Sequence, residues 1–119
     1  MTQKAIVPNA SQLTYTSYLK VHELLDLQKL QSRPEQHDET LFIIIHQVYE
    51  LWFKQQLHET DYLCRALIED DIDSASSTIA RMLTILKTMV AQVDILETMT
   101  PVSFLMGSGS AHPWGTFFP

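Results

Sequence analysis

The chain has 119 residues, of which 45% are hydrophobic, and it carries a formal net charge of −6 at pH 7. This length suits one small domain with a core, and the hydrophobic content excludes general disorder. The acidic balance argues against nucleic acid as a partner, because phosphate binding requires clusters of Lys and Arg. The chain has a single cysteine, no apolar run long enough to span a bilayer and no apolar stretch typical of a signal peptide. We therefore expect a cytoplasmic protein with no membrane partner.

The N-terminal part predicts a flexible arm followed by a short helix. Residues 1–13 are mostly polar or small, which is typical of an arm. A helix is expected from about Tyr18 to Leu30, capped by Thr16 or Ser17. It ends before Pro34, because the residue before a proline disfavours the helical conformation.

Two long stretches then show apolar residues at helical spacing. The first begins at Asp38 and runs to about Glu69, and the second runs from about Ala75 to Thr98 with Asp73 or Ser74 as its cap. Helices of this kind pack as an antiparallel pair. The predicted fold class is all-α, and residues 105–119, which contain all three glycines, predict an irregular tail.

Phe42 and His46 are the most suggestive pair for chemistry. They are four residues apart in an apolar stretch, so they share one helical face and could line one pocket. His46 could hold a substrate N–H, or it could be a core histidine whose ring binds a backbone carbonyl. Cys64 is expected to be a buried structural thiol and His58 a surface residue. We predict no metal site built from side chains, since the Glu-x-x-His pattern of helical di-metal proteins is absent.

Three ordered motifs resemble the tryptophan 2,3-dioxygenase family. Residues 13–19 read LTYTSYL and resemble the family's Leu-x-Tyr-x-x-Tyr-Leu start. Residues 37–54 read HDETLFIIIHQVYELWFK and resemble its motif His-Asp-Glu-x-Leu-Phe-Ile-Ile-x-His-Gln-x-x-Glu-Leu-Trp. Residues 96–104 read LETMTPVSF and resemble its Leu-Glu-x-Met-Thr-Pro-x-x-Phe segment. The resemblance assigns residues 14–104 to the N-terminal part of this helical, haem-binding fold.

The resemblance also implies a reaction and a set of site residues. Family members are homotetramers that use haem to insert O2 across the C2–C3 bond of the L-tryptophan indole, giving N-formylkynurenine. His46 would be the catalytic residue that hydrogen-bonds the indole N–H, and Phe42 would pack on the indole. Tyr15, Tyr18 and Leu19 would reach the pocket of a neighbouring subunit. Phe104, the last residue of the third motif, would also be a substrate-binding residue.

Two departures from the family pattern shape the expectation for this chain. Gly107 and Ser108 stand where the family has Phe-Arg, whose arginine holds the substrate carboxylate. The family's proximal haem histidine lies in a C-terminal half, and His112 in the glycine-rich tail is a poor substitute. We therefore expect a truncated or frameshifted enzyme portion that is inactive alone. The alternatives are a non-catalytic helical oligomerisation module and a diverged paralogue that acts on another indole.

Overall fold

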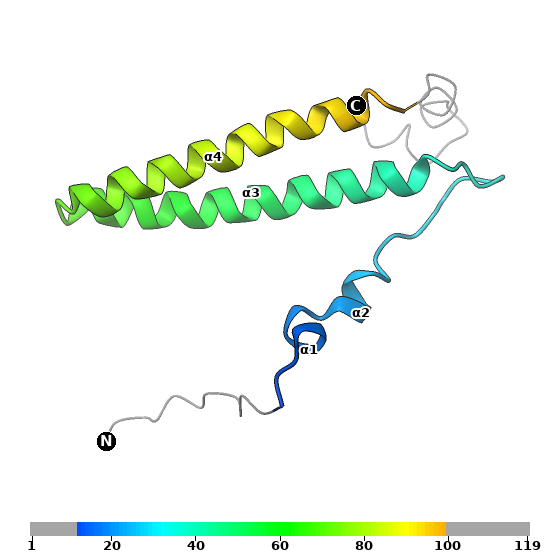
Figure 1. Cartoon of the computed structure of the whole chain (residues 1–119), viewed down its shortest axis with the longest axis horizontal. Helices are drawn as coiled ribbons and strands as arrows, with labels where there is room; N and C mark the ends of the chain where they lie inside the picture. The colour runs from blue at the N-terminus through cyan, green and yellow to red at the C-terminus, as the bar shows by residue number, and fades with distance from the viewer. Residues whose placement is uncertain (1–11, 100–119) are drawn as a thin grey trace.

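The computed structural model describes residues 12–99, and these form four helices and no strand. In chain order the helices are α1 (Tyr15–Leu19), α2 (Val21–Leu24), α3 (Glu39–Ile68) and α4 (Ile72–Leu96). Helices α3 and α4 lie side by side as a long antiparallel hairpin, and the segment with α1 and α2 leads into the start of α3 (Figure 1). The predicted all-α class is confirmed for this part of the chain.

Hydrogen bonds between side chains of α3 and backbone carbonyls of α4 fix the register of the hairpin. The hydroxyl of Tyr49 donates to the carbonyl of Met89 at 2.7 Å, and the amide of Gln56 donates to the carbonyl of Met82 at 3.0 Å. Few side chains are fully buried between the helices, as expected for a two-helix layer. The buried apolar residues are Phe42, Ile45, Ala66, Ala75 and Met89.

The turn between α3 and α4 closes through a Schellman motif. The amide of Asp71 donates to the carbonyl of Ala66 at 2.9 Å, and the amide of Asp70 donates to the carbonyl of Leu67 at 3.3 Å. This pattern requires a left-handed residue after the helix, and Asp70 adopts it with φ of 56°. Aspartate tolerates this conformation better than most residues other than glycine. The predicted end of the first long helix, near Glu69, is therefore confirmed.

Helix α4 begins earlier than its predicted start. The prediction placed the cap at Asp73 or Ser74, but the carboxylate of Asp71 accepts from the amide of Ser74 at 3.1 Å and Asp71 is the N-cap. The early start follows from the tight turn, because the chain re-enters helical geometry directly after Asp70. Hydrogen bonds from the side chain and the backbone of Ser74 lower the pKa of Asp71 below its ordinary value of 3.8.

The predicted helix from Tyr18 to Leu30 is wrong in its bounds. Thr14 forms a capping box with Ser17, so α1 starts at Tyr15. The chain breaks at Lys20, which is left-handed with φ of 52°, and α2 then ends at Leu24. The Leu24 carbonyl accepts from the side-chain amide of Gln28 at 3.0 Å, which replaces a further helical turn.

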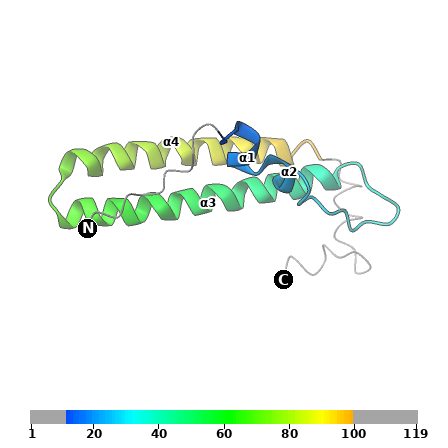
Figure 2. The ribbon, with the colours of Figure 1, turned by 90° about the horizontal axis from the view of Figure 1, so that it is seen from below.

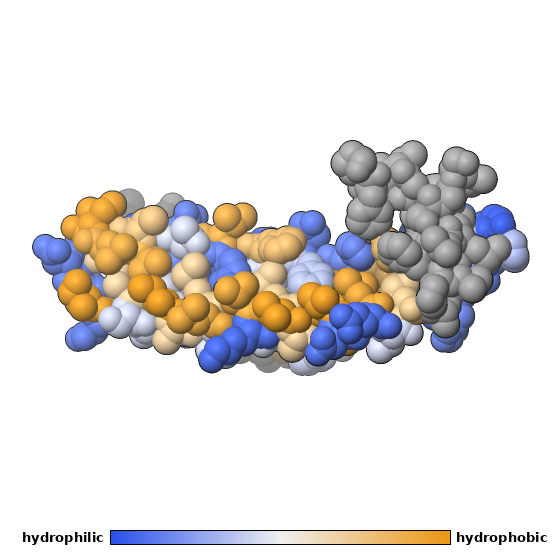
Figure 3. All heavy atoms as spheres, turned by 90° about the horizontal axis from the view of Figure 1, so that it is seen from above, coloured by the Kyte–Doolittle hydropathy of each residue, from blue (hydrophilic) through white to orange (hydrophobic). Residues whose placement is uncertain are grey.

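Many large apolar side chains on the hairpin remain exposed. On α4 they recur every three or four residues and form a row that we call the outer α4 row: Ile79, Leu83, Leu86, Val90 and Val93. Apolar residues follow the hairpin along much of its length in Figure 3. Within residues 12–99 no helix is both long and apolar enough to cross a membrane.

Candidate functional site

The Phe42–His46 pair lies in the first three turns of α3. Their ring centroids are 4.2 Å apart with an interplanar angle of 35°. Phe42 is 9% exposed, whereas His46 is half-buried. The spacing predicted this contact, because residues four apart meet on one helical face.

The tautomer of His46 follows from its contact with the backbone. Its Nδ1 lies 2.7 Å from the carbonyl oxygen of Phe42. A carbonyl oxygen only accepts, so Nδ1 carries the proton and donates. In the neutral ring the lone pair is then on Nε2, which makes that atom a hydrogen-bond acceptor. The interpretation of His46 as a ring that binds a backbone carbonyl is thus confirmed, and it fixes the orientation of the ring.

An apolar groove of about 420 Å³ runs beside His46, between α3 and α4. Its lining residues are His46, Tyr49, Glu50, Phe53, Met89, Val90, Val93 and Leu96. The rings of Tyr49 and Phe53 stack with centroids 6.2 Å apart. The groove suits a flat apolar ligand whose one polar group faces His46. Phe42 lies against the His46 ring but is not among the residues that line this groove.

The three predicted site residues on α1 do not join the pair within one chain. Tyr15 is 77% exposed, Tyr18 is 68% exposed and Leu19 is 45% exposed. Helix α1 packs on α2, and α1 and α2 lie off the hairpin in Figure 1 but overlap it in the perpendicular view of Figure 2. Phe104, the remaining predicted site residue, lies outside the described residues, as do Gly107, Ser108 and His112.

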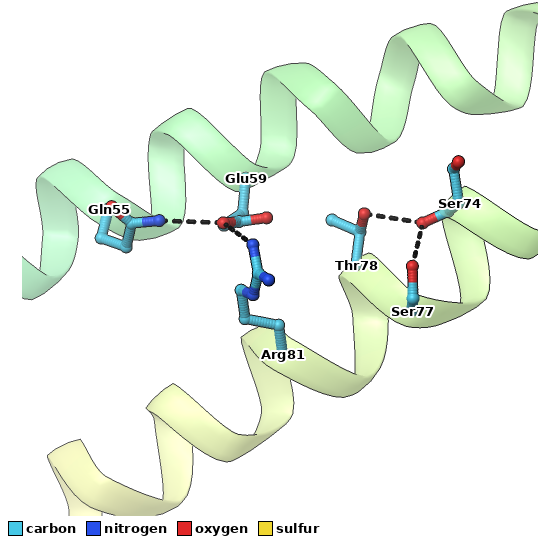
Figure 4. Close-up of polar contacts among 6 residues, drawn as sticks. All are labelled: Gln55, Glu59, Ser74, Ser77, Thr78 and Arg81. Atoms are coloured by element: carbon cyan, nitrogen blue, oxygen red, sulfur yellow. Dashed lines mark hydrogen bonds and ion pairs between the residues drawn. The ribbon is translucent and has the colours of Figure 1, made fainter.

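A polar cluster near the α3–α4 turn was not predicted from the sequence (Figure 4). The side chain of Glu59 is 5% exposed, and its Oε1 accepts from Gln55 at 2.8 Å and from Arg81 at 3.2 Å. This carboxylate borders a cavity of about 310 Å³, which His58 and Tyr62 also line. Glu59 has no distinctive signal in the sequence, because its helical neighbours include Gln55 and Gln56, and only the pairing of α3 with α4 shows its partner Arg81.

Two further predictions concern single side chains. His58 is exposed, which confirms its prediction as a surface residue. The prediction that Cys64 is buried is wrong, because its side chain is exposed on the outer side of α3. No three His, Cys, Asp or Glu side chains of residues 12–99 come together as they would around a metal ion.

A family model described as tryptophan 2,3-dioxygenase matches residues 2–108, which is most of the chain. The chain belongs to the tryptophan 2,3-dioxygenase family. The resemblance predicted from three motifs is thereby confirmed.

Curated relatives of the same name agree with this match. The tryptophan 2,3-dioxygenase of Herpetosiphon aurantiacus is 62% identical over 98 residues, covering 82% of this chain and 38% of the relative. The Anaeromyxobacter sp. (strain K) protein is 54% identical over 96 residues, covering 81% of this chain and 36% of the relative. The Nocardioides sp. protein is 48% identical over 99 residues, covering 80% of this chain and 37% of the relative.

The chain therefore spans less than two fifths of the length of these tryptophan 2,3-dioxygenases, and it corresponds to their N-terminal portion. The groove beside His46 and the outer α4 row, which share Val90 and Val93, are both open within residues 12–99.

Proposed function

We propose that this chain supplies the indole-binding wall of a haem-dependent tryptophan 2,3-dioxygenase. The reaction inserts both atoms of O2 across the C2–C3 bond of the L-tryptophan indole, so that bond breaks, two C=O groups form and N-formylkynurenine is released. Family membership supports the reaction type. The observation that carries the assignment of the site is the fixed orientation of His46, whose Nδ1 donates to the Phe42 carbonyl.

In this proposal His46 and Phe42 have separate roles. Nε2 of His46 accepts the indole N–H, which orients the ring in the groove. Phe42 holds the His46 ring through their aromatic contact and can offer the indole only the 9% of its surface that is exposed. Tyr49 and Phe53 extend the aromatic surface of the groove away from His46.

Residues 12–99 do not by themselves fit a haem. A haem pocket requires a second apolar wall opposite the first, whereas the groove beside His46 is open on one side within residues 12–99. We therefore assign the haem ligation to the part of the family fold that this chain does not span. The chain's own residues bind and orient the indole.

The exposed residues of α1 suit a role between subunits. Tyr15, Tyr18 and Leu19 each leave at least 45% of their surface exposed within residues 12–99, and this surface is aromatic or apolar. In the proposed homotetramer they reach the indole pocket of a neighbouring subunit, where they exclude water. L-tryptophan and O2 are the proposed substrates, and the cytoplasm is the proposed location.

A second candidate function is a helical oligomerisation module without catalysis. The outer α4 row favours it, because an exposed apolar row with spacing of three and four residues matches the seam of paired helices. A measurement of indole binding distinguishes the two candidate functions, because only the first expects indole to bind beside His46.

Titration of the purified chain with indole, followed by NMR of His46, tests the proposal. We expect the ring signals of His46 to shift on binding, with a loss of affinity of about tenfold in His46→Ala, because a buried hydrogen bond is lost. His58→Ala is the matched control, since His58 lies on the same helix outside the groove. Equal affinities of the two variants would contradict the proposal. Haem titration should give no Soret band typical of an axially ligated iron.

A further inference from the structure

A fully buried carboxylate closes the start of α3. Glu39 is 0% exposed, and Ser32, which it contacts, is 1% exposed. Oε1 of Glu39 accepts from the Ser32 hydroxyl at 2.7 Å and from the Ser32 amide at 2.9 Å. The amide of Gln31 donates to both carboxylate oxygens at 3.0 Å. We call this set of contacts the Glu39 clasp.

The Ser32 hydroxyl extends the clasp to the rest of the loop. It accepts from the amide of Gln36 at 3.0 Å while it donates to Glu39. The loop from Gln31 to Gln36 is thus folded onto the first residue of α3 by a single carboxylate. Each of these bonds satisfies a polar group that would otherwise be buried without a partner.

The clasp lies on the same face of α3 as the indole-binding pair. Phe42 follows Glu39 by three residues and His46 follows it by seven, a spacing that places all three on one side of the helix. Glu39 and Phe42 are both buried, and the Phe42 carbonyl is the acceptor that orients His46. The geometry of His46 therefore depends on the first turns of α3 being formed.

We propose that Glu39 is a positioning residue for the Phe42–His46 pair. By holding residues 31–36 against the start of α3, it keeps the first turns helical, keeps Phe42 buried and keeps the Phe42 carbonyl in place for Nδ1 of His46. Glu39 touches neither substrate nor cofactor in this account. The importance of this role for indole binding rests on the proposed function, whereas its effect on His46 does not.

The test compares Glu39→Ala and Ser32→Ala with Asp61→Ala in the 119-residue chain. Asp61 is an exposed carboxylate of the same helix, lies outside the groove beside His46 and is the matched control. Ser32→Ala removes two hydroxyl bonds and leaves the carboxylate, so it serves as the milder variant if Glu39→Ala folds poorly. The readouts are amide hydrogen exchange, the tautomer of His46 from its ring ¹⁵N shifts, and affinity for indole.

We expect Glu39→Ala to raise exchange at residues 31–42 about tenfold or more, to mix the His46 tautomers and to weaken indole binding, with a smaller effect in Ser32→Ala. Exchange in α4 should stay as in the parent chain, and in Asp61→Ala it should stay so throughout the chain. Uniformly faster exchange in α3 and α4, or an unchanged His46 tautomer, would overturn the proposal. If the parent chain binds no indole, the proposed function fails, but exchange and the tautomer still decide the role of Glu39.

Discussion

The α3–α4 hairpin and the segment before it, residues 12–38, belong to one chain but hold their shapes in different ways. The hairpin is fixed by contacts between its own two helices, such as the Tyr49–Met89 hydrogen bond. The segment is held by its attachment to α3, through the Glu39 clasp and the bonds of Gln47, while its apolar residues face outward. The shape of the hairpin is therefore determined by the pairing of its own two helices. The shape of residues 12–38 depends on the surface that they pack against.

The largest expected effect concerns the uncovered faces. We expect the chain to self-associate, and the double substitution of Leu83 and Val90 to Asp to raise the dissociation constant at least about tenfold. Burying one such side chain is worth about 1.5–3 kcal/mol. Sedimentation velocity at micromolar concentrations measures this. Thr84→Asp with Thr88→Asp adds the same charge at exposed polar positions and is the control. A parent chain that sediments as a monomer would contradict the expectation.

The next effect concerns the buried hydrogen bonds of Glu59 between α3 and α4. Glu59→Ala should lower the free energy of unfolding by about 1–2 kcal/mol, because it removes the acceptor for Gln55 and Arg81. The loss of stability is no larger because the Arg81 side chain is 67% exposed, so water solvates it when Glu59 is removed. Urea unfolding followed by far-UV circular dichroism gives the value. Asp61→Ala, at an exposed site of the same helix, should change it little.

A smaller effect concerns the hydrogen bonds by which Gln47 attaches residues 12–38 to the hairpin. Gln47 accepts from the side chain of Gln28 at 2.8 Å and donates to the carbonyl of Leu27 at 3.0 Å. Gln47→Ala should therefore loosen residues 24–28 by about 1 kcal/mol without changing the unfolding of the hairpin. Limited proteolysis and hydrogen exchange report the segment separately from α3 and α4. A matching loss of stability in α4 would show that the two regions fold as one unit.

The smallest expected effect depends on pH. Since hydrogen bonds from Ser74 lower the pKa of Asp71 in the folded chain, its contribution to stability is present above its ordinary pKa of 3.8. The contribution disappears as the pH falls through the lowered value. The difference in melting temperature between the parent chain and Asp71→Ala should therefore narrow in acid. Asp71→Asn, which caps without titrating, should keep a constant difference from Asp71→Ala.

The sequence predicted the hairpin well because its helices follow their own apolar periodicity over many turns. It also predicted the Phe42–His46 contact, which needs only the spacing of one helix. It failed for residues 18–30, where Lys20 adopts a left-handed conformation and Leu24, Leu25 and Leu27 stay exposed. Helical propensity without packing does not sustain a helix there.

Partners across the tertiary fold were beyond sequence reasoning for the same reason. Glu39 meets Ser32 over a loop, and Glu59 meets Arg81 over the hairpin. No periodicity encodes such pairs. Glu39 is followed by the apolar residues Phe42 and Ile43 on the next turn, but Glu59 is preceded by Gln55 and Gln56, so the two sites share no sequence pattern that identifies the donor.

The role of His46 is tested most directly in a hybrid enzyme. In the Herpetosiphon aurantiacus tryptophan 2,3-dioxygenase, the 98-residue stretch that matches this chain is replaced by the corresponding residues of this chain. N-formylkynurenine formation from L-tryptophan is then followed by absorbance. We expect an active hybrid in which His46→Ala lowers kcat/KM by about 10²-fold or more while His58→Ala leaves it near the parent value. A folded, haem-loaded hybrid in which the two variants behave alike would contradict the assignment of His46 as the residue that holds the indole.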